Sequence, residues 1–188
     1  MTLNDGLEEI GKEAFGQCTL LEQIIIPNTV KMVIKDWAFS MCEGLMTATL
    51  GDRLEEIGDD AFCSCNSLQG IVIPNNVERI MKGAFCECLA LMTVILGKGL
   101  EEIEYEAFGW CASLEHIVIP CNAKEIHNSM FNTCANLTHV EFFNKIEEFM
   151  SCKAMQNWWN HSLHEESRRT YCFLVKYNLP LHFGLVRV

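Results

Sequence analysis

One phrase of about 23 residues recurs six times along the chain, and it constrains the fold more than any other feature. Each copy holds an Ala-Phe pair, a cysteine three residues after the phenylalanine and a leucine three residues after the cysteine. The cysteines are Cys18, Cys42, Cys65, Cys88, Cys111 and Cys134. The sixth copy has Met130 in place of its alanine, and the second has one extra residue within residues 29–36, where we expect a bulge. Repetition at a fixed period predicts a solenoid in which each coil contacts only its neighbours.

The leucine of each copy opens a short apolar phrase with the pattern of a β-strand. Residues 68–74 read Leu-Gln-Gly-Ile-Val-Ile-Pro, and residues 114–120 read Leu-Glu-His-Ile-Val-Ile-Pro. β-Branched residues spaced two apart suit a strand with one face turned inward. Proline and glycine alternate directly after the phrase in successive copies: Pro27, Gly51, Pro74, Gly97 and Pro120. Proline cannot continue a hydrogen-bonded ladder and glycine accepts unusual dihedrals, so both predict a bend there.

This pattern resembles the BspA-like leucine-rich repeat family, whose repeats read roughly Leu-x-x-Ile-x-Ile-Pro, then Val-x-x-Ile-Gly, then Ala-Phe-x-x-Cys. Residues 68–74 carry the first part, and Ile57-Gly58, Ala61-Phe62 and Cys65 carry the rest. The resemblance covers about residues 2–143. It implies an α/β-type, β-rich, right-handed solenoid with a stacked parallel β-sheet that serves protein recognition. It implies no catalytic residue, because the family has no common active site.

A change in charge marks a module boundary near residue 144. Residues 1–143 carry 8 Lys and Arg against 21 Asp and Glu, whereas residues 144–188 carry 6 against 4. We therefore expect a solenoid over 1–143 and a helical C-terminal cap over 144–188, where aromatic residues fall at helical spacings. Trp158 and Trp159 would pack onto the last repeat; the alternative is that they form an exposed docking site.

The N-terminus aligns with the interior of a strand phrase, since residues 2–7 match residues 49–54. An open solenoid edge exposes unpaired backbone. We therefore expect either a truncated chain or an edge covered by a partner, including self-association through this edge. No basic leader or long apolar run is visible, which predicts a cytoplasmic protein without membrane insertion. An N-terminally truncated fragment would instead predict an extracellular surface location.

The acidic composition bears on the partner. A net charge of −11 argues against nucleic-acid binding, which depends on Lys and Arg meeting phosphates. The pairs Glu55-Glu56 and Glu101-Glu102 recur with the structural period. A residue pair that repeats in every other coil indicates a surface stripe rather than an acid–base pair of an active site. These acidic residues favour a basic protein as partner.

Eleven cysteines raise the alternatives of metal binding and disulfide formation. Cys63-Ser64-Cys65 and Cys86-Glu87-Cys88 lie one repeat apart but lack the spacing typical of zinc knuckles. The repeat itself accounts for six of the eleven as small, buried, reduced residues stacked in a column. Residues stacked in adjacent coils lie roughly 4.8 Å apart, which leaves oxidation geometrically feasible. We expect no metal site and no cofactor.

The outward positions of the strand phrase are the candidate binding residues, since the inward ones fill the core. One outward column reads Ile25, Thr49, Val72, Ile95 and Val118. The flanking candidates are Gln69, Met92, Glu115 and His116. An exposed apolar strip is typical of a partner site, although β-branched residues also simply suit a parallel ladder.

These observations together predict a non-enzymatic protein–protein interaction scaffold that binds its partner over the outward column, with acidic edges formed by Glu55, Glu56, Glu101 and Glu102. The alternatives are a structural or cell-surface adhesion protein, or a regulatory part of a larger protein.

Overall fold

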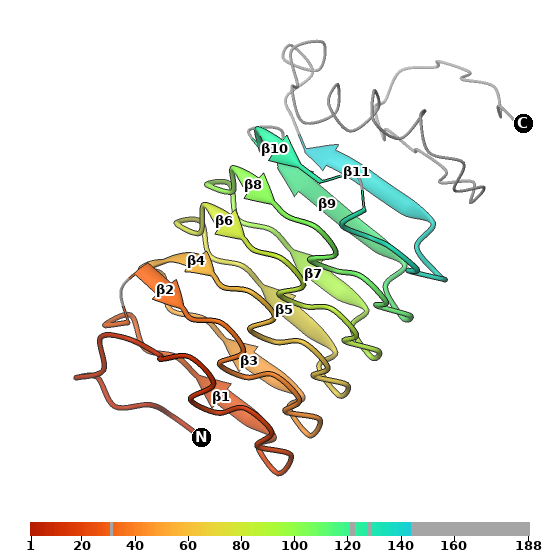
Figure 1. The fold of residues 1–188 in the computed structure, drawn as a ribbon. Coiled ribbons are helices and arrows are strands. Elements are labelled where there is room, and N and C mark those ends of the chain that lie inside the picture. Colours follow the sequence, from red (N-terminus) through yellow and green to blue (C-terminus); the bar gives the residue numbers. More distant parts are fainter. Residues whose placement is uncertain (31, 121–122, 128, 144–188) are drawn as a thin grey trace, which may run out of the picture.

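The computed structural model describes residues 1–30, 32–120, 123–127 and 129–143. These residues form a solenoid of stacked coils with two parallel β-sheets, as the sequence predicts (Figure 1). Strands and turns, but no helix, make up this described part, so the repeat is an all-β version of the expected α/β-type solenoid. The predicted helical cap over 144–188 lies outside the described residues.

The strand predicted from the Leu-x-x-Ile-x-Ile phrase forms the larger sheet, with one strand per coil. Its members are β1 (Gln23–Ile25), β3 (Thr47–Thr49), β5 (Gly70–Val72), β7 (Thr93–Ile95), β9 (His116–Pro120) and β11 (His139–Phe143). They lie in the order β1-β3-β5-β7-β9-β11, and every neighbouring pair is parallel. The register aligns equivalent residues, so Val72 lies opposite Ile95 and Ile95 opposite Val118.

A second sheet, which the sequence pattern did not predict, lines another side of the solenoid. It consists of β2 (Met32–Ile34), β4 (Leu54–Ile57), β6 (Arg79–Ile80), β8 (Glu102–Ile103) and β10 (Glu125–Ile126). Several of these strands are only two residues long. The apolar residues around them, such as Val77 and Ile80, are three positions apart, so the alternation of apolar and polar residues that predicts a strand is missing. The expected bulge is confirmed, because the pairing of β2 with β4 shifts register between Met32 and Val33.

The Ala-Phe segment forms the third side and binds neighbouring coils without being a strand. The amide of Phe62 donates to the carbonyl of Ala84 (2.7 Å) and that of Ser64 to Cys86 (2.8 Å). The intervening Cys63 amide donates within its own turn, to Asp60 (3.0 Å). Residues Asp60 and Ser64 adopt positive φ, 51° and 58°, which turns alternate amides along the solenoid axis.

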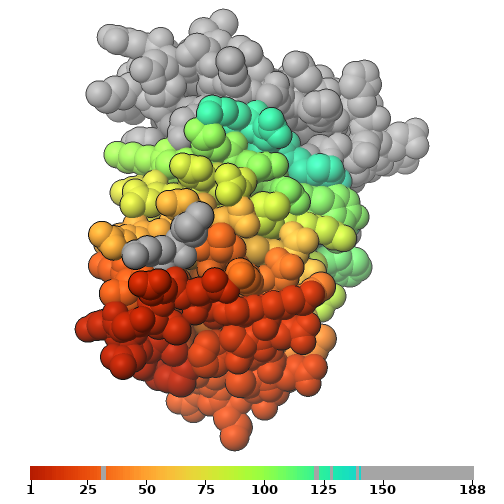
Figure 2. All heavy atoms as spheres, turned by 60° about the vertical axis from the view of Figure 1, so that its left-hand side comes forward, coloured from red at the N-terminus to blue at the C-terminus, as the bar shows by residue number. Residues whose placement is uncertain are grey.

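The core is a stack of identical layers, and Figure 2 shows the coils following one another in sequence order. The phenylalanines of the Ala-Phe pairs form its central column. Ring centroids of Phe39 and Phe62 lie 5.0 Å apart and those of Phe62 and Phe85 5.2 Å, with nearly parallel planes. The stack loosens at its C-terminal end, where Phe108 and Phe131 are 6.0 Å apart and tilted by 32°. Each layer therefore buries the apolar face of the next.

Five of the six repeat cysteines are buried in the core as predicted, whereas the prediction is wrong at Cys18, which is exposed. The structure supplies a further reason for the buried ones. Each thiol of five coils donates a hydrogen bond to the phenylalanine carbonyl of the preceding coil, over 2.9–3.2 Å. Burial raises the pKa of Cys42 and of Cys134 to about 11, which keeps both thiols protonated. The eight cysteines among the described residues are all free thiols.

The alternation of proline and glycine turns has a steric cause. A Cβ placed on Gly97 would collide with the carbonyl of Pro74 in the preceding coil. Gly51 stands in the same relation to Pro27. A glycine turn thus allows the coil to seat directly on the backbone of a proline turn.

The first residues of the chain pair with the outer edge of β1. Leu3 donates its amide to the carbonyl of Ile25 (3.1 Å), and the Ile25 amide donates to the carbonyl of Met1 (3.0 Å). Ile10 forms a parallel bridge with Ile34 next to the second sheet. This segment is therefore the outermost backbone next to β1, and the prediction that its own outer edge is covered by a partner stays a prediction.

Candidate binding surface

The predicted outward column lies on the outer face of the larger sheet. Ile25, Val72 and Ile95 are 45%, 58% and 55% exposed, and Thr49 is exposed between them. Val118 is half-buried. The residues next to them along each strand point inward and are buried, for example Ile71 and Val94. Strand pairing therefore sets the column as a continuous row across five coils, with neighbours about one strand spacing (~4.8 Å) apart.

The flanking candidates lie beside this row. Gln69, Glu115 and His116 are exposed, and Met92 is 53% exposed directly before β7. Met46 occupies the same position before β3 and is exposed too, so the apolar surface is wider than the column alone. Clustered exposed apolar side chains are unusual on a soluble surface unless something covers them.

A hollow of about 570 Å³ opens over β7 and β9, at one end of the column. Its lining combines apolar and charged side chains: Met92, Ile95, Lys98, Glu115, His116, Val118 and Pro120. Lys98 and Pro120 were not among the residues predicted from the sequence. Lys98 lies in the turn after β7, and Pro120 is the last residue of β9, although the pattern marked both positions only as bends.

The structure places the four predicted acidic residues elsewhere. Glu55 and Glu56 lie in β4, Glu102 in β8 and Glu101 directly before it, so all four belong to the second sheet. Their role as acidic edges of the outward column stays a prediction. Period alone could not separate the two sides, because every position of a coil recurs with the same spacing.

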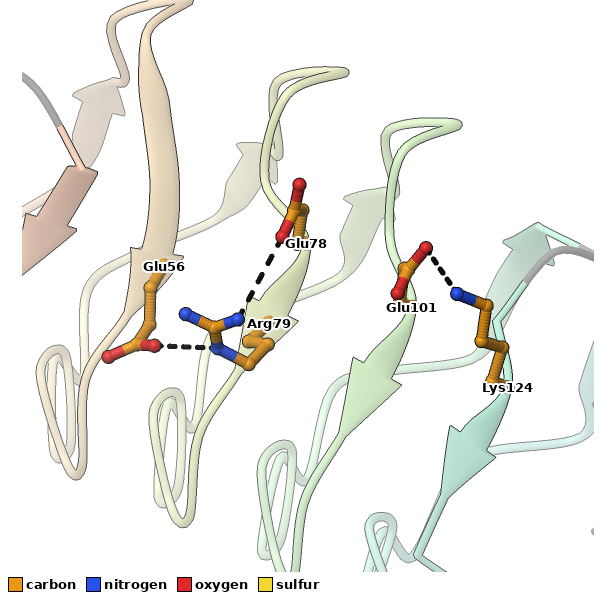
Figure 3. A network of polar contacts seen from close by, with 5 residues as sticks. All are labelled: Glu56, Glu78, Arg79, Glu101 and Lys124. Atoms are coloured by element: carbon orange, nitrogen blue, oxygen red, sulfur yellow. Dashed lines mark hydrogen bonds and ion pairs between the residues drawn. The ribbon is translucent and has the colours of Figure 1, made fainter.

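Two of these glutamates, Glu56 and Glu101, take part in ion pairs between coils (Figure 3). Arg79 donates from Nε to Glu56 at 2.7 Å and approaches Glu78 at 3.8 Å. Lys124 meets Glu101 at 2.6 Å. The pairs Arg79–Glu56 and Lys124–Glu101 each join equivalent positions of adjacent coils, which supports a structural surface stripe.

Glu102 has the perturbed carboxyl of this sheet. Burial raises its pKa above the ordinary value, and the charges of Glu104 and Glu125 add to the rise, while Arg79 opposes it. The group sits in a repeating row of like residues on the sheet. Burial, with the like charges of this row added to it, accounts for the raised pKa without an active site.

In the part of the chain that the structure describes, no three His, Cys, Asp or Glu side chains come together in an arrangement that would hold a metal ion. No helix in that part is long and apolar enough to cross a membrane.

A parallel β-solenoid of short stacked coils, with an exposed apolar row on one sheet, defines a repeat protein of the leucine-rich class. The sequence matches the BspA type leucine rich repeat region in six copies, over residues 1–80 and 55–158. The chain belongs to this family. The match runs past residue 143, where the sequence analysis placed the boundary of the solenoid.

Three solved structures of bacterial proteins are similar to this chain. A leucine rich cell surface protein from Faecalibacterium prausnitzii is 28% identical, with a TM-score of 0.64 over 70% of this chain and 34% of that one. The pneumococcal vaccine antigen PcpA is 25% identical, with a TM-score of 0.64 over 73% and 36% of the two chains. A leucine rich repeat protein of T. pallidum is 28% identical, with a TM-score of 0.52 over 75% and 57%. The chain thus spans about a third of the length of the first two. Among curated proteins, none matches the sequence.

Proposed function

We propose that this solenoid is a non-enzymatic scaffold that binds a protein partner over the outward column of the larger sheet. The observation that carries the proposal is the row of exposed apolar side chains at Ile25, Val72 and Ile95, widened by Met46 and Met92. Inward positions of the same strands already fill the core, so core packing does not require apolar residues outside. The half-exposed row offers the kind of apolar contact that forms the centre of a protein interface.

The partner would present an apolar segment to the row and carry a net positive charge. Residues 1–143 carry 8 basic against 21 acidic side chains, which draws cationic proteins toward the solenoid. Glu115 lies beside the row itself and lines the hollow over β7 and β9. Since the glutamates of the second sheet lie away from the row, their effect is long-range attraction rather than direct contact. Association should therefore slow as the salt concentration rises.

Paired substitutions test the proposed surface. We expect Val72→Lys with Ile95→Lys to abolish recovery of the partner in affinity capture from the source cell, because charges would replace the centre of the contact. The matched control is Met41→Lys with Trp110→Lys, at 47% and 48% exposed apolar residues of the Ala-Phe side. Loss with the first pair and retention with the second supports the site. Equal recovery with both pairs would exclude the outward column.

A cell-surface adhesion role is the second candidate, and the F. prausnitzii relative favours it because that protein is described as a cell surface protein. An extracellular location then replaces the cytoplasmic one that the sequence predicts. Protease treatment of intact source cells separates the two locations, since only a surface protein is digested while a cytoplasmic marker survives.

Self-association forms a further part of the proposal. Met1–Leu3 cover β1, so the backbone available for pairing with a second copy is that of this outermost segment. Light scattering over a range of concentrations tests it: a mass that stays that of one chain would exclude it.

A further inference from the structure

Cys63 and Cys86 occupy the same position in two adjacent coils, directly after Phe62 and Phe85. This position lies outside the column of buried cysteines, which comes two residues later. In the other coils it holds Gly16, Ser40, Gly109 and Asn132. The fold therefore does not require cysteine there, and two cysteines stacked on each other call for a separate explanation.

The backbone holds the two residues in register. The hydrogen bonds Phe62 to Ala84 (2.7 Å) and Ser64 to Cys86 (2.8 Å) tie the coils together on both sides of Cys63. Residues aligned in this way lie roughly 4.8 Å apart, within the range of about 4.4–6.8 Å between Cα atoms that a disulfide spans. Both side chains are half-buried free thiols, and the Cys63 Sγ lies 3.6 Å from the Ser64 Oγ.

The two thiols are chemically different. The hydrogen bond from Cys86 lowers the pKa of Cys63, because it stabilises the thiolate. The same bond, together with burial, raises the pKa of Cys86. A thiolate is the reactive form of cysteine. Cys63 is therefore the attacking nucleophile, and Cys86 is the resolving thiol that attacks the mixed disulfide.

We propose that Cys63 and Cys86 are a redox modification site that forms a reversible disulfide between adjacent coils. The oxidant is a low-molecular-weight disulfide of the glutathione class. The Cys63 thiolate attacks one of its sulfurs, forming a mixed disulfide and releasing one glutathione thiolate. The Cys86 sulfur then attacks Cys63, its proton passing to the second glutathione as that leaves. The first glutathione thiolate takes up the proton that Cys63 lost on ionising. In total the protein loses two electrons and two protons, and one glutathione disulfide becomes two glutathione thiols.

Cys65 and Cys88 provide an internal comparison, since they stack with the same spacing two residues further on. Both are fully buried, and each thiol donates to a phenylalanine carbonyl rather than to another sulfur. Burial raises the pKa of both thiols. Proximity is therefore common to the two pairs, whereas exposure and an activated thiolate distinguish Cys63 and Cys86.

The test is oxidation of the native chain in buffers of reduced and oxidised glutathione, followed by alkylation, trypsin and mass spectrometry. Trypsin leaves Cys63 and Cys65 in one peptide and Cys86 and Cys88 in another, so both pairs would link the same peptides. Fragmentation of the linked peptides, and the variants Cys63→Ser/Cys86→Ser and Cys65→Ala/Cys88→Ala, separate them. Circular dichroism checks that each variant keeps its strands.

We expect a Cys63–Cys86 link that reduced glutathione reverses, that the Cys63→Ser/Cys86→Ser variant lacks and that the Cys65→Ala/Cys88→Ala variant keeps. In Cys86→Ser, a glutathione adduct should accumulate on Cys63; in Cys63→Ser, Cys86 should react more slowly. Glutathione addition to the exposed Cys18 reports that the buffer oxidises the chain. Oxidation at Cys18 without a Cys63–Cys86 link would overturn the proposal, as would equal linking of Cys65 with Cys88. The proposal does not depend on the binding surface, which lies on the larger sheet.

Discussion

The thiol of Cys88 donates a hydrogen bond to the carbonyl oxygen of Phe62, 26 residues earlier, at 3.1 Å. The same bond recurs from coil to coil, so the cysteine column fastens each coil to the one before it as well as filling space. A buried thiol would otherwise be an unremarkable small apolar residue.

Cys88→Ala should lower the free energy of unfolding by about 1–3 kcal/mol, because the change leaves a void and removes a buried hydrogen bond. Urea denaturation measures the loss. The matched control is Cys18→Ala, at the exposed cysteine of the first repeat, which should change stability by no more than about 0.5 kcal/mol. Similar losses at both positions would show that the bond to the phenylalanine carbonyl is unimportant.

Phe85→Ala should be more damaging, with a loss of about 3–5 kcal/mol. Phe85 is fully buried between Phe62 and Phe108, at 5.2 and 5.5 Å, so the substitution breaks the aromatic column in the middle. Phe15→Ala, at the half-buried first ring, should cost clearly less. Thermal unfolding followed by circular dichroism compares the two, and equal effects would contradict a core organised along the stack.

Gly97→Ala should destabilise the solenoid by about 1–3 kcal/mol, since the new methyl group meets the backbone of Pro74 and the coils must move apart. A backbone carbonyl cannot swing aside as a flexible side chain can. The control is Gly11→Ala, where an added Cβ meets nothing within 4 Å. Chemical denaturation of the two variants should separate them, and a neutral Gly97→Ala would refute the seating of glycine turns on proline turns.

Glu102→Gln should stabilise the protein at neutral pH and leave its stability unchanged in acid. The pKa of Glu102 is raised above its ordinary value of 4.5, so the folded state binds this proton more tightly than the unfolded chain does. Stability therefore falls as the pH rises from about 4.5 through the raised pKa, and stays lowered above it.

Urea denaturation at two pH values checks the sign. The Glu102→Gln variant should be more stable than the wild type at pH 7 and equal to it below the ordinary pKa of glutamate. Glu101→Gln is the comparison, because it removes the exposed ion pair with Lys124 and should be neutral or slightly destabilising. A Glu102→Gln variant that is less stable at pH 7 would contradict charge crowding on the second sheet.

The sequence by itself determined the repeat, its register and the inward positions of the larger sheet. Every copy places the same residue type at the same repeat position. An inward apolar side chain such as Ile71 leaves water only by packing against the next coil. The positions of the outward column at Val72 and Ile95 follow from the same alternation. The extra residue of the second copy also predicted the bulge in β2.

Only the tertiary structure decided how the sides of one coil are arranged. The short strands of the second sheet, such as β8, are held by hydrogen bonds to neighbouring coils, and no local pattern records those bonds. For the same reason the period could not show that Glu101 and Glu102 lie on a different sheet from Ile95. The chemistry of Cys63 likewise depends on Cys86, which is 23 residues away in sequence and becomes its neighbour only when the coils stack. The repeat therefore determines the fold of each coil, whereas contacts between coils determine which side chains become neighbours on each surface.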